Sequence, residues 1–179
     1  MSSSTKKQKY EKFLPLLVSL LFIALLAGLV LSIKKSGYHL IYSPTPSMPI
    51  GFYFVMPTKK IKKMDIVEFT PPKDVLQFVR ENRWVPKRGK IIKYVFALPG
   101  DKVCIKNDEL WINNEKICKI HKYYDENKLL PQTKFCGKLK DDQYLLLSTK
   151  NERSFDGRYF GPIEKQKITG RAVPILTIK

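Results

Sequence analysis

Three short segments of this chain carry side chains that together could hydrolyse a peptide bond. They are a serine in a proline-rich run, a lysine in an apolar run and a late serine–acid–arginine set: Ser47, Lys93, Ser154, Asp156 and Arg158. A serine hydroxyl is a weak nucleophile and needs a base, and a neutral lysine amine can be that base. The residues in this order predict a serine protease that works without histidine.

Lys93 is the lysine best suited to act as a base. A free lysine has a pKa of ~10.4 and is charged at neutral pH, but burial in apolar surroundings lowers that pKa. Lys93 lies in the run 91–98, where Ile91 and Val95 share its side of a predicted strand. The alternative is a charged residue that protects an exposed sheet edge from aggregation. The local pattern is compatible with both.

The surroundings of Ser47 favour a packed site over a plain linker. Prolines at positions 44, 46 and 49 stiffen the backbone, and Gly51 permits a sharp turn or a close approach of substrate. A linker has no need of apolar residues such as Met48 and Phe52. The Thr45 hydroxyl is expected to join the Ser47 N–H in binding an oxyanion.

The third segment is expected to support the other two. Asp156 and Arg158 are predicted to form a structural ion pair, and Ser154 is predicted to hydrogen-bond the Lys93 amine and hold its orientation. The alternative is a turn with a surface salt bridge, which contributes little to stability. No Cys-x-x-Cys or His-x-x-x-His spacing occurs in the sequence, so no metal and no other cofactor is expected.

An apolar segment precedes the candidate site. Residues 13–33 are 21 uncharged residues, and a helix that rises ~1.5 Å per residue can cross a ~30 Å hydrocarbon core over that length. A cleaved signal peptide would have an apolar region of only ~7–15 residues, so a retained transmembrane helix is favoured. Four lysines precede it and two follow, a bias that predicts a cytoplasmic tail at 1–12 and an extracytoplasmic domain at 36–179.

The charge of the chain favours anionic partners. The net charge is +17, and beyond the first 35 residues the body still holds 27 basic and 15 acidic residues, a net charge of +12. A tethered basic domain is expected to lie near anionic lipid headgroups. The alternative is that most of these lysines form a solvated face. No specific nucleic acid is expected as a partner.

Short apolar or β-branched runs predict a mainly β body. The expected strands are 39–42, 52–56, 66–69, 91–98, 103–105, 110–112, 144–148 and 172–178. Apolar residues at helical spacing predict a short amphipathic helix within 73–83, and the polar stretch 119–142 is expected to be irregular. Three cysteines permit three single disulfides in the part expected outside the cytoplasm. Cys104 with Cys136 is the favoured pair, and three buried thiols are the alternative.

Taken together, the three segments resemble the type I signal peptidase clan of membrane-bound serine–lysine proteases. Ser47-Met48 resembles the nucleophile segment of that clan. Lys93, eight residues before Asp101 in a Leu-Pro-Gly-Asp turn, is similar to the lysine base. The late segment is similar to the C-terminal motif, with Gly157 where serine is common.

Within the clan, the chain departs from the housekeeping enzymes. Those show Ser-Gly-Ser-Met followed by Pro-Thr one residue later, whereas here Pro49 follows Met48 directly. The pattern Thr-x-Ser-x-Pro-x-Gly-x-Tyr over 45–53 is similar to the TraF-type peptidases of conjugative transfer systems. The segment 154–161 and the small size are TraF-like too.

The resemblance implies an all-β catalytic domain with an apolar, membrane-facing edge, preceded by a single transmembrane helix in a bacterial inner membrane. It implies that Lys93 takes the proton of Ser47, that an acyl-enzyme forms, and that water or an amine resolves it. The implied substrate is a preprotein, in the TraF branch a pilin precursor, with small residues before the cut. Asp156 is assigned a catalytic role in the TraF branch and a structural role in housekeeping enzymes, and the sequence leaves both open.

Two other functions compete with this one. The first is a housekeeping signal peptidase with broad preprotein substrates. The second is a non-catalytic basic membrane protein that binds DNA or anionic lipid, for which Ser47 would be dispensable and clusters such as Lys59–Lys63 would matter.

Overall fold

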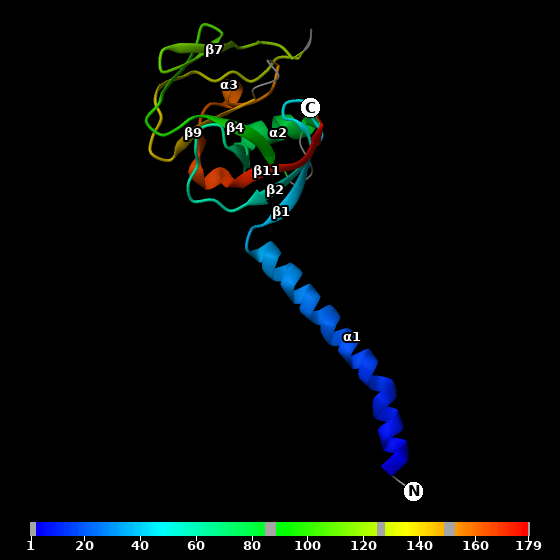
Figure 1. The fold of residues 1–179 in the computed structure, drawn as a ribbon. Coiled ribbons are helices and arrows are strands. Elements are labelled where there is room, and N and C mark those ends of the chain that lie inside the picture. Colours follow the sequence, from blue (N-terminus) through cyan, green and yellow to red (C-terminus); the bar gives the residue numbers. More distant parts are fainter. Residues whose placement is uncertain (1–2, 85–88, 125–127, 149–152, 179) are drawn as a thin grey trace. The chain divides into compact units, whose positions relative to one another are not determined.

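The computed structural model describes residues 3–84, 89–124, 128–148 and 153–178 of the chain. The chain divides into two compact units, Met1–Tyr38 and His39–Lys179 (Figure 1). The first unit is the helix α1, Ser3–Lys35, which extends beyond the predicted apolar run at both ends. Phe13–Ile33 within α1 has a mean hydropathy of 2.9, and none of it is buried, so this helix is long and apolar enough to cross a membrane.

The second unit is mainly β, as the sequence predicts, and contains two antiparallel sheets. The larger sheet has seven strands in the order β1-β2-β11-β3-β4-β9-β10, and the smaller has four in the order β7-β6-β5-β8. The strands of the larger sheet are β1 His39–Ser43, β2 Ile50–Met56, β3 Ile66–Phe69, β4 Ile91–Ala97, β9 Gln143–Leu147, β10 Ile163–Glu164 and β11 Ile168–Ile178. The strands of the smaller sheet are β5 Lys102–Lys106, β6 Glu109–Ile112, β7 Glu115–Lys119 and β8 Phe135–Lys138. Two α-helices and one 3-10 helix complete the unit: α2 Lys73–Glu81, α3 Gly157–Phe160 and η1 Lys165–Lys167.

The predicted strands and the helix at 73–83 are present, with ends shifted by a few residues. The expectation that 119–142 is irregular is wrong, because β8 lies within it and pairs with β5. The sequence of β8 has one large apolar residue, Phe135, and a glycine, which has a low β-propensity. Its strand conformation therefore comes from its partner strand, which local sequence does not reveal.

The smaller sheet packs its inner face against the larger one. Val103, Leu110 and Ile112 of the smaller sheet share a core cluster with Leu145 of β9 and with Tyr159 of α3. This packing fixes the short helix α3, which is too short to be stable alone. It thereby positions the late segment that contains Asp156.

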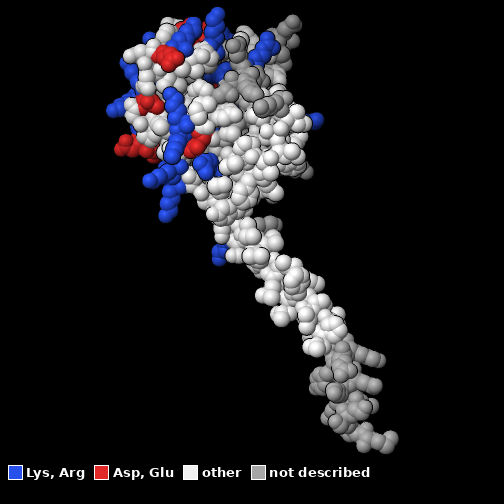
Figure 2. Space-filling view, in the orientation of Figure 1, with Lys and Arg blue, Asp and Glu red and all other residues white. Residues whose placement is uncertain are grey.

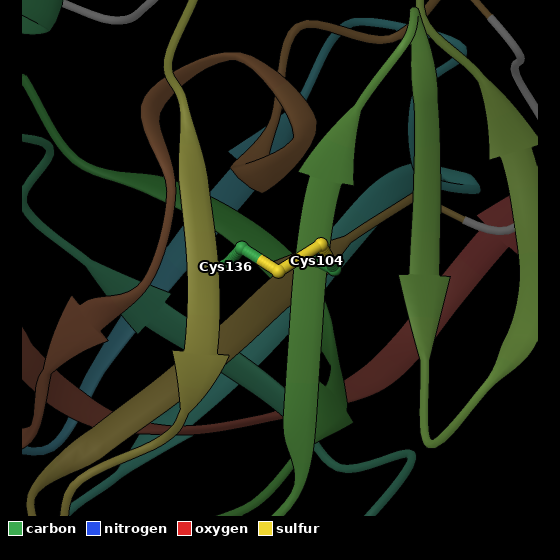
Figure 3. The surroundings of a disulfide bond; sticks show 2 residues. All are labelled: Cys104 and Cys136. Atoms are coloured by element: carbon green, nitrogen blue, oxygen red, sulfur yellow. A yellow bond between two sulfur atoms is a disulfide. The ribbon is translucent and has the colours of Figure 1, made fainter.

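A disulfide joins two neighbouring strands of the smaller sheet. Cys104 of β5 and Cys136 of β8 are directly opposite each other and bonded (Figure 3). The favoured pairing is therefore present in the structure. The bond closes a loop with a sequence separation of 32 residues, which connects the polar stretch after β7 to the hairpin.

One face of the larger sheet exposes rows of apolar side chains from β1, β2 and β11. Leu40 and Val173 flank Phe54 in one row, and Tyr42 and Leu176 flank Phe52 in the next. The exposed members of this apolar face are Leu40, Tyr42, Phe52, Val173, Leu176 and Ile178. Figure 2 shows a broad uncharged area on the side of the body where β1, β2 and β11 lie, whereas Lys and Arg side chains gather on the opposite side. An apolar area of this kind indicates contact with a membrane or another protein.

Candidate active site

Ser47 lies in the turn that connects β1 to β2. The Met48 N–H donates to the Thr45 carbonyl at 3.4 Å, and the buried Met48 side chain packs in a core cluster with Tyr53. The Tyr53 hydroxyl donates to the Pro49 carbonyl at 2.6 Å. Ser47 itself stays half-buried. The apolar residues around Ser47 therefore hold the turn, so the segment is not a plain linker.

Gly51 serves a different purpose from the substrate approach suggested by the sequence. Its φ is +148°, and a Cβ at this position would collide with the backbone carbonyl of Leu176 in β11. The glycine therefore permits close packing of β2 against β11. This packing anchors the end of the Ser47 turn.

Lys93 lies inside the larger sheet. Strand β4 pairs with β3 along 91–94 and with β9 from Tyr94 onward, and Lys93 is only 3% exposed. The alternative of an exposed edge-strand lysine is therefore wrong. Its Nζ donates a hydrogen bond to Ser154 Oγ at 2.9 Å. Burial lowers the pKa of Lys93 from 10.5 to about 8, with Asp156 raising it and Arg158 lowering it by smaller amounts.

Ser47, Lys93 and Ser154 line one cavity of about 610 Å³. Ser47 Oγ lies 3.1 Å from Thr45 Oγ1, so the two hydroxyls share a hydrogen bond. In the described part of the chain, no hydrogen bond joins Ser47 Oγ to Lys93 Nζ. Catalytic hydrogen bonds are often formed only once a substrate is bound, and the shared cavity places both groups beside the same space.

Asp156 and Arg158 form the expected ion pair, and it is buried. Arg158 Nε lies 2.8 Å from Asp156 Oδ1, and Arg158 Nη2 lies 3.1 Å from Asp156 Oδ2. Asp156 is fully buried and Arg158 is 3% exposed. Burial opposes the charge of Arg158, but the Asp156 carboxylate outweighs it, so the pKa of Arg158 lies above its ordinary value. The pair is therefore not the weak surface salt bridge of the alternative interpretation.

Ser148 is a site residue that sequence reasoning missed. Its backbone N–H donates to Asp156 Oδ2 at 2.9 Å, and its hydroxyl donates to the carbonyl oxygen of Ser47. It connects the buried ion pair to the backbone of the Ser47 turn. The sequence signal that could have identified Ser148 is its position at the end of a predicted strand, six residues before Ser154.

Position 157 is glycine in this chain, whereas the C-terminal motif of the signal peptidase clan commonly has serine there. A Cβ on Gly157 would lie 2.7 Å from the Leu146 carbonyl oxygen and 3.0 Å from Leu145 Cδ1. The backbone of β9 therefore leaves no room for a side chain here. Glycine lets α3 lie directly against β9.

Among the residues that the structure describes, two strand edges beside the cavity have no partner strand. The residues Ile91, Ile92 and Lys93 pair with β3, whereas β9 pairs with β4 only from Tyr94 onward. Strand β1 ends the strand order of its sheet and pairs with β2 alone. Residues 40–43 of β1 and 91–93 of β4 both line the cavity. Backbone groups on such edges can bind an extended peptide by main-chain hydrogen bonds.

Comparison with known proteins adds independent evidence. The family described as "Signal peptidase, peptidase S26" matches residues 13–177. The Plasmid transfer protein TraF of Escherichia coli is 27% identical over 165 residues, 87% of this chain and 92% of that protein. The Conjugal transfer protein TraF of Agrobacterium fabrum is 28% identical over 164 residues, 84% of this chain and 92% of that protein.

Similarity over a smaller part of the chain extends to signal peptidase I. A Probable signal peptidase I-2 of Synechocystis is 34% identical over 84 residues, which is 45% of this chain and 35% of that protein. The crystal structure of a signal peptidase I from Enterococcus faecalis is 22% identical and covers 63% of this chain and 97% of its own, with a TM-score of 0.37. That structural likeness is too weak to support an inference.

Proposed function

The chain belongs to the signal peptidase family, peptidase S26, and from this membership we propose that Ser47 is its nucleophile and Lys93 its general base. The family makes the protein a serine peptidase that acts on preproteins. The family and the apolar helix α1 together indicate a membrane-anchored protein. The observation that carries the proposal is a buried lysine with a pKa of about 8 in the same cavity as Ser47.

The lowered pKa makes Lys93 a usable base. With a pKa of about 8, roughly a tenth of the molecules hold the neutral amine at pH 7. The neutral amine accepts the Ser47 proton while the hydrogen bond to Ser154 holds its orientation. The Ser47 oxygen attacks the scissile carbonyl, and the resulting oxyanion is stabilised by the Ser47 N–H and the Thr45 hydroxyl.

The reaction then proceeds through an acyl-enzyme. The Lys93 ammonium returns its proton to the leaving amine, which departs as the new N-terminus of the mature protein. Water then attacks the Ser47 ester and loses a proton to Lys93, which releases the leader segment and restores the Ser47 hydroxyl. If the N-terminal amine of the acylated segment attacks the Ser47 ester instead of water, that segment leaves as a cyclic peptide and the Ser47 hydroxyl is restored.

The substrate binds as an extended strand next to the edges of β1 and β4. Both edges line the cavity next to the residues of the proposed dyad. A pilin precursor of a conjugative transfer system is the proposed substrate, because the two TraF relatives match most of this chain. The local match to a probable signal peptidase I supports the alternative, a peptidase with broad preprotein substrates.

We place residues 36–179 outside the cytoplasm, with the apolar face against the bilayer. The disulfide Cys104–Cys136 supports this location, because such bonds persist in oxidising compartments. The lysines before α1 are then cytoplasmic, and the basic body lies near anionic headgroups. A Phe52→Trp variant of the reconstituted full chain should be quenched by lipids brominated on their acyl chains, whereas a Lys102→Trp control should not. Equal quenching of the two would contradict the contact.

The test of the dyad uses the full chain reconstituted in lipid vesicles. Wild type, Ser47→Ala and Lys93→Ala are each incubated with a pilin precursor or with a general preprotein, and product masses are read. Ser36→Ala and Lys102→Ala are matched controls, because both residues lie outside the cavity. We expect cleavage by wild type and by both controls, and none by the dyad variants.

Each outcome of this test has a distinct meaning. Cleavage by Ser47→Ala would reject the dyad. Cleavage of the general preprotein alone would replace the pilin proposal with the broad-substrate alternative. A product lighter than the linear peptide by one water would identify cyclisation.

A further inference from the structure

Helix α2 ends at Glu81 and is followed, after its C-cap Asn82, by Arg83 at a position where glycine is usually found. The Arg83 N–H donates to the Arg80 carbonyl at 3.0 Å, and the Trp84 N–H donates to the Val79 carbonyl at 2.9 Å. The Trp84 ring packs against Phe78 with ring centroids 5.6 Å apart. These bonds and this contact define a Schellman motif, whose residue at the Arg83 position adopts a left-handed conformation.

The conformation of Arg83 is unfavourable for this residue type. Its φ is +56°, a region in which a Cβ meets steric strain that glycine avoids. Local stability therefore gives no reason for an arginine here. Residues held in such conformations tend to occur at functional sites.

The Arg83 side chain lines the same cavity as Ser47 and Lys93. Within the described ranges of the chain, its guanidinium forms no salt bridge and no hydrogen bond. Its neighbour Arg80, on the last turn of α2, does not line the cavity. Arg83 is thus a cation without a partner among the described residues that line this cavity.

The charges of the cavity wall favour an anion. Glu68 is the one carboxylate among the described lining residues, and it is 1% exposed. His39 lies 3.0 and 3.1 Å from its two oxygens, Lys90 lies 3.2 Å away, and Thr169 donates to it as well. Glu68 is therefore already neutralised and hydrogen-bonded by these partners, and in the described part of the chain it forms no salt bridge or hydrogen bond with Arg83. A cleft with a surplus of one charge concentrates ligands of the opposite charge.

We propose that Arg83 is a specificity-determining residue that binds a carboxylate of the substrate close to the bond that is cut. A guanidinium matches a carboxylate with two parallel hydrogen bonds. The carboxylate is an Asp or Glu side chain or the C-terminal carboxylate of the substrate, which share this chemistry. The proposal rests on the proposed peptidase function, because the cavity must bind substrate for Arg83 to select it.

The test exploits the unfavourable conformation of Arg83. An Arg83→Gly variant loses the guanidinium but relieves the backbone, so its Tm should be equal to or higher than that of wild type. Arg80→Ala is the matched control, since it removes an arginine from the same helix outside the cavity. If Arg83→Gly loses selectivity while its Tm is unchanged or higher, unfolding cannot be the cause of the loss.

The probe is a synthetic peptide mixture in which every residue type occurs at every position, offered to the reconstituted full chain. One mixture has amidated C-termini and one has free C-termini. We expect wild type and Arg80→Ala to prefer Glu over Gln, or a free over an amidated end, by about 10- to 100-fold in kcat/KM. Arg83→Gly should cleave the preferred and disfavoured peptides equally. The mixture in which the preference occurs identifies the source of the carboxylate.

A binding measurement separates failure of this proposal from failure of the peptidase function. The Ser47→Ala variant, with or without Arg83→Gly, is immobilised and its retained peptides are counted. Preferential retention of carboxylate peptides that depends on Arg83 supports the proposal even if wild type cleaves nothing. An identical peptide preference with and without Arg83, or no preference in either assay, overturns it.

Discussion

The Nζ atom of Lys93 donates a hydrogen bond of 2.9 Å to the hydroxyl oxygen of Ser154, a residue 61 positions later in the chain. A neutral lysine amine has two protons and one lone pair. Because one proton is directed to Ser154, the rotation of the amine is restricted. Ser154 thus supports the proposed base without being consumed in the reaction.

The pH dependence of cleavage should follow the ionisation of Lys93. The amine is active only when neutral, so kcat/KM should rise with pH and level off above about 8, the pKa of Lys93. A pH–rate profile of the reconstituted protein measures this. A profile that is flat from neutral to alkaline pH would exclude Lys93 as the base.

The buried lysine should also destabilise the protein at neutral pH. The pKa of Lys93 is lowered from 10.5 to about 8 on folding, so the unfolded chain binds more protons between these values. The free energy of unfolding carries no penalty from Lys93 above pH 10.5, where the lysine is neutral in both states. The penalty grows as pH falls and is complete below about 8.

A Lys93→Met variant should therefore be more stable than wild type at pH 7, by up to about 3 kcal/mol. The difference in the free energy of unfolding should shrink as pH rises toward 10.5. Denaturant unfolding at several pH values checks this. A stability difference that does not change with pH would mean that folding leaves the pKa of Lys93 at its ordinary value, so that the lysine is charged in the folded protein at pH 7.

Removal of one partner from the buried ion pair should be more harmful than removal of both. Asp156→Asn leaves the Arg158 charge buried and unpaired, which should cost about 3–5 kcal/mol of unfolding free energy. The double variant Asp156→Asn with Arg158→Met should recover part of that loss. Thermal unfolding of wild type and these two variants distinguishes a structural role for Asp156 from a purely catalytic one, for which stability would be unchanged.

A serine at position 157, which is common in the resembling motifs, should not fit this chain. The Leu146 carbonyl lies 2.7 Å from the position of a Cβ. Gly157→Ser should therefore shift α3 away from β9 and cost about 1–3 kcal/mol. Gly137, where a Cβ has no neighbour within 4 Å, is the matched control. Equal Tm values for Gly157→Ser and Gly137→Ser would show that α3 adapts without strain.

Much of the site was predictable from sequence because its residue types and their local spacing indicate their chemistry. The apolar run of α1, the lysine in the apolar run 91–98 and the spacing of Ser154, Asp156 and Arg158 are local patterns. They predict a membrane helix, a buried base and an ion pair, and the structure contains an apolar helix, a buried lysine and that ion pair. The assignment of the dyad itself stays a prediction until it is tested.

Other features depend on contacts between residues far apart in the chain. Ser148 contacts Ser47 across 101 positions, and β8 is a strand because β5 lies beside it. The role of Gly51 depends on the approach of β11, and that of Arg83 depends on the cavity it faces. A local pattern records which residues prefer burial, strand or turn. It does not record which distant backbone fills the neighbouring space, and only the tertiary structure decides that.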